Sequence, residues 1–92
     1  MTLQDALFNW AQIRLVADAR PDDHAAAETA DFFAEILQED HQVTSFGLVV
    51  VDEEIIRLDY THEGVNKSQS YDRDRVERLL ADIRSNPKYN EQ

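Results

Sequence analysis

Acidic side chains recur at spacings of three and four residues in the second quarter of the chain, and such spacings place side chains on one face of a helix. The four residues are Glu28, Asp31, Glu35 and Glu39. A row of carboxylates can attract a basic partner by charge complementarity, and carboxylates also bind Ca²⁺ or Mg²⁺. His24 precedes Glu28 by four residues. The chemistry to consider is therefore docking of a basic surface or a carboxylate metal site.

Residue types elsewhere argue against a catalytic centre. The chain has no Cys, so it offers no thiol nucleophile and no thiolate metal ligand. Its three histidines, His24, His41 and His62, lie at predicted element boundaries, and its two glycines form no phosphate-binding loop. Metal sites in helical bundles use a Glu-x-x-His motif at inward-facing positions, which this sequence lacks. We therefore predict no catalytic residue, no metal ligand and no cofactor, and a carboxylate metal-dependent enzyme is only the third alternative.

The net charge of the chain comes from one segment. The sequence has 19 Asp and Glu against 9 Lys and Arg, which is a formal charge of −10. From Pro21 to Ile56 there are ten acids and no Lys or Arg, whereas the rest of the chain holds nine acids and nine bases. Such acidity argues against direct binding of nucleic acid or of an anionic membrane. We expect the partner to be a basic protein surface.

Phe32 and Ile36 flank the acidic row and could act as apolar anchors for a partner. The pattern predicts a small non-catalytic protein that docks a basic partner through its acidic second helix. An inhibitor that mimics nucleic-acid phosphates is the alternative, because a row of carboxylates could occupy a nucleic-acid-binding protein. A purely solubilising face is the simplest explanation of the acids. Such a helix usually mixes charge signs, however, and this one has no interleaved lysine.

The spacing of apolar residues predicts the elements that position these side chains. Apolar residues at helical spacing predict helices, and alternating or β-branched runs predict strands. Thr2 with Asp5 resembles a capping box at the start of the first helix. Pro21 with two following acids suits the first turn of the second helix, and residues 62–64 resemble a three-residue hairpin loop. The predicted elements are helices 3–19, 21–40 and 73–85 and strands 43–51, 56–61 and 65–71.

This order, α-α-β-β-β-α, predicts an α+β fold with three helices packed on a small three-stranded antiparallel sheet. A length of 92 residues suits one domain. We predict that residues 1–86 form a single α+β domain and that residues 87–92 are a frayed C-terminal tail. The sequence shows no apolar run of about 18 residues and no basic-then-apolar leader, so we expect a cytoplasmic protein.

The first helix carries a second apolar stripe beside its main one. The stripe consists of Phe8, Ala11 and Leu15, and the predicted packing of the sheet and the second helix uses only the main stripe. A two-fold dimer would bury such a surface, so the stripe is a candidate homodimer interface. The alternative is that the sheet and the third helix cover the stripe within one chain.

Overall fold

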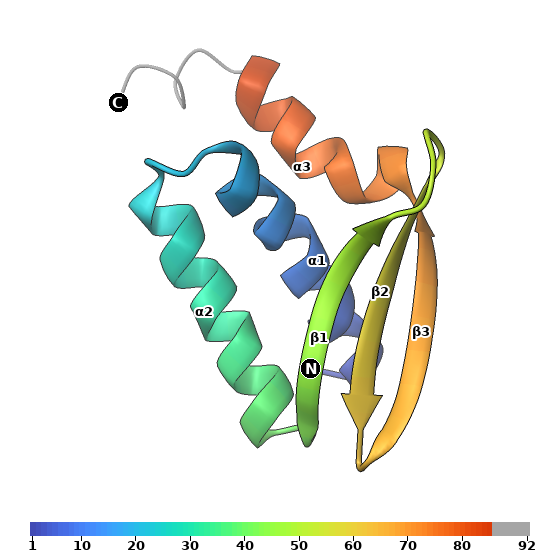
Figure 1. Ribbon diagram of the computed structural model, residues 1–92. Helices are drawn as coiled ribbons and strands as arrows, with labels where there is room; N and C mark the ends of the chain where they lie inside the picture. The colour runs from blue at the N-terminus through green and yellow to red at the C-terminus, as the bar shows by residue number, and fades with distance from the viewer. Residues whose placement is uncertain (86–92) are drawn as a thin grey trace.

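The order of elements predicted from the sequence is the order that the structure shows. The computed structural model describes residues 1–85 as three helices and a three-stranded antiparallel sheet (Figure 1). The prediction of an α+β fold is confirmed. The predicted tail, residues 87–92, lies outside the described residues. The elements are α1 (Leu3–Ala19), α2 (His24–Glu39), β1 (Val43–Val50), β2 (Ile55–His62), β3 (Val65–Asp72) and α3 (Arg73–Ser85).

α1 is the element on which the others pack. It begins after Thr2, whose Oγ1 accepts a hydrogen bond from the N–H of Asp5 at 3.1 Å. α1 buries side chains around much of its circumference, as expected for a helix with a broad apolar arc. One part of this surface packs in the main core with the sheet, and its C-terminal part packs in a second cluster with α2 and α3. The buried residues of α1 are Ala6, Leu7, Trp10, Ala11 and Val16.

α2 begins later than the sequence predicts. Pro21 and Asp22 form a turn instead of the first helical turn, and Asp23 is the N-cap. The Oδ1 atom of Asp23 accepts a hydrogen bond from the N–H of Ala26 at 3.0 Å, while its Oδ2 pairs with the Nε of Arg20 at 3.3 Å. The bond from Ala26 is the main reason that the pKa of Asp23 is lowered. A carboxylate with two donors fixes the helix start better than a proline that donates no hydrogen bond.

The three strands form an antiparallel meander in the order β1-β2-β3. The turn between β1 and β2 depends on Asp52, whose Oδ1 accepts from the N–H groups of Glu54 and Ile55 at 2.8 Å each. The second hairpin differs from the prediction of a three-residue loop, because His62 pairs with Val65. Its loop is only residues 63–64, and both have positive φ angles, 52° and 81°, as a type I′ turn requires.

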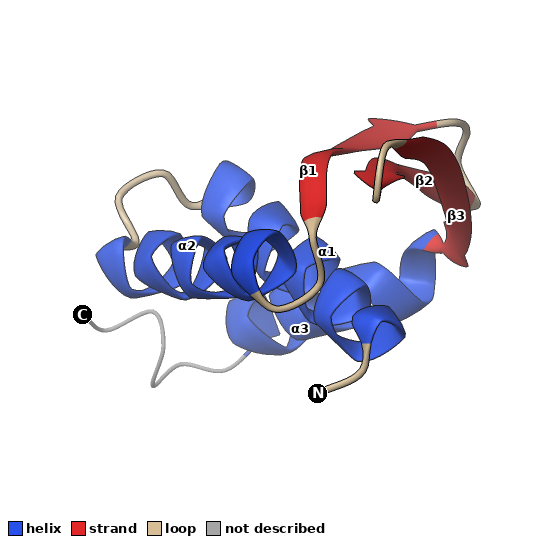
Figure 2. Ribbon diagram, turned by 90° about the horizontal axis from the view of Figure 1, so that it is seen from below, coloured by secondary structure: helices blue, strands red, loops and turns tan. Residues whose placement is uncertain are grey.

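The sheet is covered on one face only. Three buried residues of β2, Ile56, Leu58 and Tyr60, alternate with less buried polar residues that face the other way. On the covered face the Trp10 ring meets the Phe46 ring edge to face, with centroids 4.8 Å apart. Figure 2 shows the three helices on the same side of the sheet. The opposite face of the sheet is open.

The cap of α2 can be tested directly. Asp23→Ala should lower the free energy of unfolding by about 1 kcal/mol, because it removes an N-cap side chain, and urea unfolding measures the loss. Asp22→Ala is the matched control, since Asp22 is exposed and its side chain forms no hydrogen bond within residues 1–85. The cap lowers the pKa of Asp23, so its contribution is complete above the ordinary value of 3.8 and is lost as the pH falls through the lowered pKa. Equal losses in both variants at neutral pH would contradict the cap.

Candidate docking surface

The acids of the predicted row lie on the side of α2 that faces away from the core. The buried residues of α2 are Ala26, Ala30 and Leu37. The four exposed acids, which we call the acidic face, are Glu28, Asp31, Glu35 and Glu39. The structure therefore brings these four predicted site residues together on one solvent-facing surface.

The negative charge of the acidic face is not balanced by neighbouring cations. Within residues 1–85, no ion pair includes any of its four carboxylates. α2 has no acidic residue in its first turn and no basic residue in its last turn, although the helix dipole favours acids at the first end and bases at the last. Glu35 and Glu39, four residues apart, repel each other near the unfavourable end. The distribution of charge at the C-terminal end of α2 thus opposes the stability of the helix.

The predicted apolar anchors lie beside the acidic face. The side chain of Phe32 is 58% exposed, and its ring packs edge to face against Phe33 with centroids 5.5 Å apart. Ile36 is partly buried and packs against the core. Phe32 and Ile36 line an open recess of about 220 Å³ together with acids at the C-terminal end of α2. Phe32 is therefore the more exposed of the two predicted anchors, and Ile36 forms part of the floor of the recess.

The stripe considered as a homodimer interface packs within the chain, as in the second of the two alternatives that the sequence left open. Ala11 is fully buried. Phe8 packs against Tyr71 with ring centroids 5.5 Å apart, and the guanidinium of Arg75 lies 4.5 Å from the centre of the Phe8 ring. Leu15 is partly buried against the core. Phe8, Ala11 and Leu15 do not form an open apolar face, because residues of β3 and α3 cover the stripe.

Within residues 1–85, the histidines and acids show no arrangement suited to holding a metal ion. In the part of the chain that the structure describes, no group of three or more His, Asp or Glu side chains could hold one. His24 and Glu28 are both exposed at the start of α2. The geometry of the acidic face therefore supports charge-assisted contacts to an external cationic group more directly than metal chemistry.

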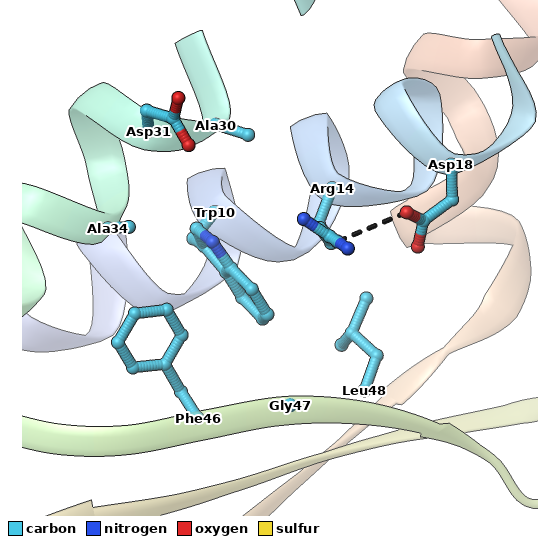
Figure 3. Close-up of a pocket in the computed structure, with 9 residues that line it drawn as sticks. All are labelled: Trp10, Arg14, Asp18, Ala30, Asp31, Ala34, Phe46, Gly47 and Leu48. Atoms are coloured by element: carbon cyan, nitrogen blue, oxygen red, sulfur yellow. Dashed lines mark ion pairs between the residues drawn. The ribbon is translucent and has the colours of Figure 1, made fainter. Parts of the chain in front are cut away.

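A groove that the sequence analysis missed lies between the helices and β1. It has a volume of about 430 Å³ and is lined by residues of α1, α2 and β1. Figure 3 shows the Trp10, Phe46 and Leu48 side chains around this space, with Arg14 joined to Asp18. The Arg14 Nε lies 3.2 Å from an Asp18 carboxylate oxygen. Three segments distant in the sequence build the groove, so no local pattern could have predicted it.

The α2 wall of this groove contains part of the acidic face. It consists of the small residues Ala30 and Ala34 together with Asp31. Asp31 is thus the acid that belongs both to the exposed row and to the groove (Figure 3). Glu39, by contrast, lines the recess beside Phe32.

The open face of the sheet carries a polar cluster that is internally neutralised. Arg57 donates to both carboxylate oxygens of Asp59, at 2.7 and 3.1 Å, and the Ser68 hydroxyl donates to Asp59 at 2.9 Å. These bonds lower the pKa of Asp59, chiefly through Arg57, and raise the pKa of Arg57. The alternation of polar residues in β2 predicts this wet face, but the cross-strand bond to Ser68 depends on the register with β3. The cluster differs from the acidic face because its charge already has a partner.

Comparison with family models, curated proteins and solved structures finds no match to this chain. Within residues 1–85, none of the helices combines the length and the apolar character needed to cross a membrane. Function must therefore be inferred from the geometry of the surfaces described above.

Charge reversal at the end of α2 tests whether the acidic face lowers stability. Glu39→Lys should raise the free energy of unfolding by roughly 0.5–1 kcal/mol, because it replaces a repulsion with Glu35 by an attraction and suits the helix dipole. Asp5→Lys is the control at the opposite end of a helix, and it should lower stability because Asp5 lies in the first turn of α1. Urea unfolding of both variants measures the difference. A loss of stability in Glu39→Lys would contradict the electrostatic account.

The polar cluster makes a separate prediction about titration. Arg57→Gln should raise the pKa of Asp59 toward its ordinary value, because it removes the largest cause of the lowering. Ser68→Ala should raise it by less. Titration of the side-chain carboxyl signals by NMR measures both changes, with Arg14→Gln as a control that leaves the pKa of Asp59 unchanged. An unaltered pKa in Arg57→Gln would show that the ion pair does not form in solution.

Proposed function

We propose that this chain is a non-catalytic protein-interaction module that docks a basic protein surface through the acidic face of α2. The observation that carries the proposal is a row of exposed carboxylates that no cation balances within residues 1–85. Such a surface attracts a positively charged partner from a distance and orients it on approach.

Folding does not require the acidic face. α2 packs through Ala26, Ala30 and Leu37 on its other side, so the exposed positions are free to hold residues of either charge. Each like-charge pair at these spacings costs about 0.2–0.5 kcal/mol, and alternating signs would stabilise the helix instead. Negative charge is therefore concentrated on this surface although it lowers the stability of the helix. Such a concentration of one charge sign suits an electrostatic docking surface.

Phe32 supplies the second property of a docking surface. Aromatic side chains bury a large area at low entropic cost, and anchors of binding energy cluster where water is excluded. Phe32 is exposed beside the acids and lies over an open recess. A basic partner with an apolar side chain at its centre could cover Phe32 while its cations meet the carboxylates around it.

The spacing of the acids favours a protein partner over the mimicry of nucleic acid. Glu39 lies eleven positions after Glu28, which is about 16.5 Å at the rise of an α-helix. Four carboxylates over this length are sparser than the phosphates of one DNA strand, which repeat about every 3.4 Å. The alternative partner is a nucleic-acid-binding protein, and identification of the captured protein would distinguish it.

Affinity capture from a lysate of the source cells tests the proposal. The immobilised chain is compared with a variant that carries Glu28→Gln, Asp31→Asn and Glu35→Gln. We expect the natural chain to hold a basic protein at low salt, to release it at high salt, and the variant not to hold it. Mass spectrometry identifies the captured protein.

A second variant separates the acidic face from net charge. It carries Asp22→Asn, Glu53→Gln and Glu54→Gln, which remove the same number of charges from exposed positions outside α2. This control should hold the partner as the natural chain does. Equal capture by all three proteins, or loss in both variants, would contradict docking through α2.

A further inference from the structure

β1 is an edge strand whose free backbone groups can be assigned. Among the described strands it pairs only with β2. The N–H of Val51 donates to the carbonyl of Ile55 at 3.1 Å, and bonded pairs alternate with non-bonded pairs along an antiparallel ladder. In the register with β2, the bonded residues are therefore Ser45, Gly47 and Val49. The residues between them direct their N–H and C=O groups to the free edge, and these are Phe46, Leu48 and Val50.

This edge lacks the sequence features that usually protect an edge strand. Natural sheets block free edges with Lys, Pro, bulges or a covering element. β1 contains neither Lys nor Pro, whereas β3, at the other edge of the sheet, carries Lys67. The one register shift of β1 lies between Val43 and Ser45, before the free edge begins. Val49 and Val50 are exposed, with Val50 at 58%.

Gly47 leaves space on the open face of the sheet, where it lies opposite Asp59 in the register with β2. A Cβ atom at this position would meet nothing within 4 Å, and Gly47 is not among the glycines with positive φ. Neither packing nor backbone conformation therefore requires a glycine here. The backbone of Gly47 also lines the groove.

The groove lies beside this edge and can receive side chains from an added strand. Figure 1 shows β1 between α2 and β2, so the free edge faces the side of α2. Alternate side chains of a strand point to the same face, and those on the helix side would enter the groove near Trp10 and Asp31 (Figure 3). A volume of about 430 Å³ is that of a typical ligand groove.

Charge decides which strand could occupy the groove. Arg14 already pairs with Asp18, whereas no ion pair in residues 1–85 includes Asp31, which lines the groove. A second copy of the chain would bring two acidic α2 walls and two charges of −10 together, and like charges oppose such an association. A basic strand avoids this repulsion and supplies a cation for Asp31.

We propose that an extended basic segment of a partner protein binds in this groove and adds a fourth strand to the sheet beside β1. Main-chain hydrogen bonds to Phe46, Leu48 and Val50 hold the segment, as in other cases of strand addition. An apolar side chain of the segment contacts Trp10, and a Lys or Arg contacts Asp31. This inference rests on the proposed function, because Asp31 is part of the acidic face, and it names the element of the partner that is recognised.

A synthetic peptide tests strand addition on the intact chain. The probe is an end-blocked peptide of repeating Val-Thr-Lys-Thr, in which Val and Lys share one face of a strand. Binding to the isotope-labelled chain is followed by NMR titration and amide hydrogen exchange. The peptide should slow exchange at the amides of Phe46, Leu48 and Val50. The amides of Gly47 and Val49, which already pair with β2, should keep their rates.

Two N-methylated forms of the peptide are the control for main-chain pairing. One form is methylated on Val and Lys, and the other on Thr, so each loses the donors of one edge. Only one edge of the peptide can face β1, and only that form should bind more weakly, by about tenfold for the loss of one or two hydrogen bonds. The form that loses affinity shows the strand direction, since antiparallel pairing uses the Val and Lys amides and parallel pairing uses those of Thr.

Two single-charge variants show which part of α2 the bound peptide contacts. Asp31→Asn should weaken binding severalfold because Asp31 lines the groove, whereas Glu39→Gln should change it little because Glu39 lines the recess beside Phe32. Equal affinity of all three peptides with unchanged exchange in β1 would overturn strand addition. If Glu39→Gln then weakens binding more than Asp31→Asn does, the peptide binds at the recess beside Phe32. In that case the proposed function stands without strand addition. No binding of any peptide at low salt would contradict both proposals.

Discussion

The packing of every other element around α1 is the constraint on which the rest of the structure depends. A chain of 92 residues can build one modest core, and here that core surrounds a single helix. Trp10 of α1 meets Phe46 of the sheet, and Val16 of α1 packs in one cluster with Ala26 of α2 and Leu80 of α3. Because α1 offers a surface to each neighbour, each neighbour needs to bury only one of its own sides.

The sheet and α2 each bury one side and leave the other exposed. These two exposed surfaces differ in how their charges are balanced. On the open face of the sheet, Arg57 is paired with Asp59, and Ser68 adds a further hydrogen bond. On the exposed side of α2, the carboxylates have no cationic partner within residues 1–85. The chain thus neutralises charge on one surface and concentrates it on the other, although neutralising both would favour stability. This difference is the physical reason for proposing that α2 and the adjoining edge of β1 dock a partner.

Local patterns in the sequence predicted more of the fold than of the surfaces. The bounds of α1 and α3 follow from apolar periodicity and are confirmed. The start of α2 was predicted wrongly because the Asp23 cap outcompetes Pro21, and the second hairpin because Glu63 adopts a positive φ. The acidic row could be predicted because it repeats along one helix. The groove and the free edge of β1 could not, because each depends on segments that meet only after folding. For the same reason the covering of Phe8 stayed one of two alternatives.

Carboxylate footprinting tests the central claim, that the acidic face binds a partner, and it works before that partner has been identified. Carbodiimide-driven labelling of the purified chain is compared with labelling of the same chain in a lysate of its source cells, with Glu53 and Glu54 in the β1–β2 turn as internal references. If the acidic face binds a basic partner, the lysate should protect Glu28, Asp31, Glu35 and Glu39 relative to the references, and high salt should remove this protection. Equal labelling of α2 and the turn under both conditions would contradict the claim.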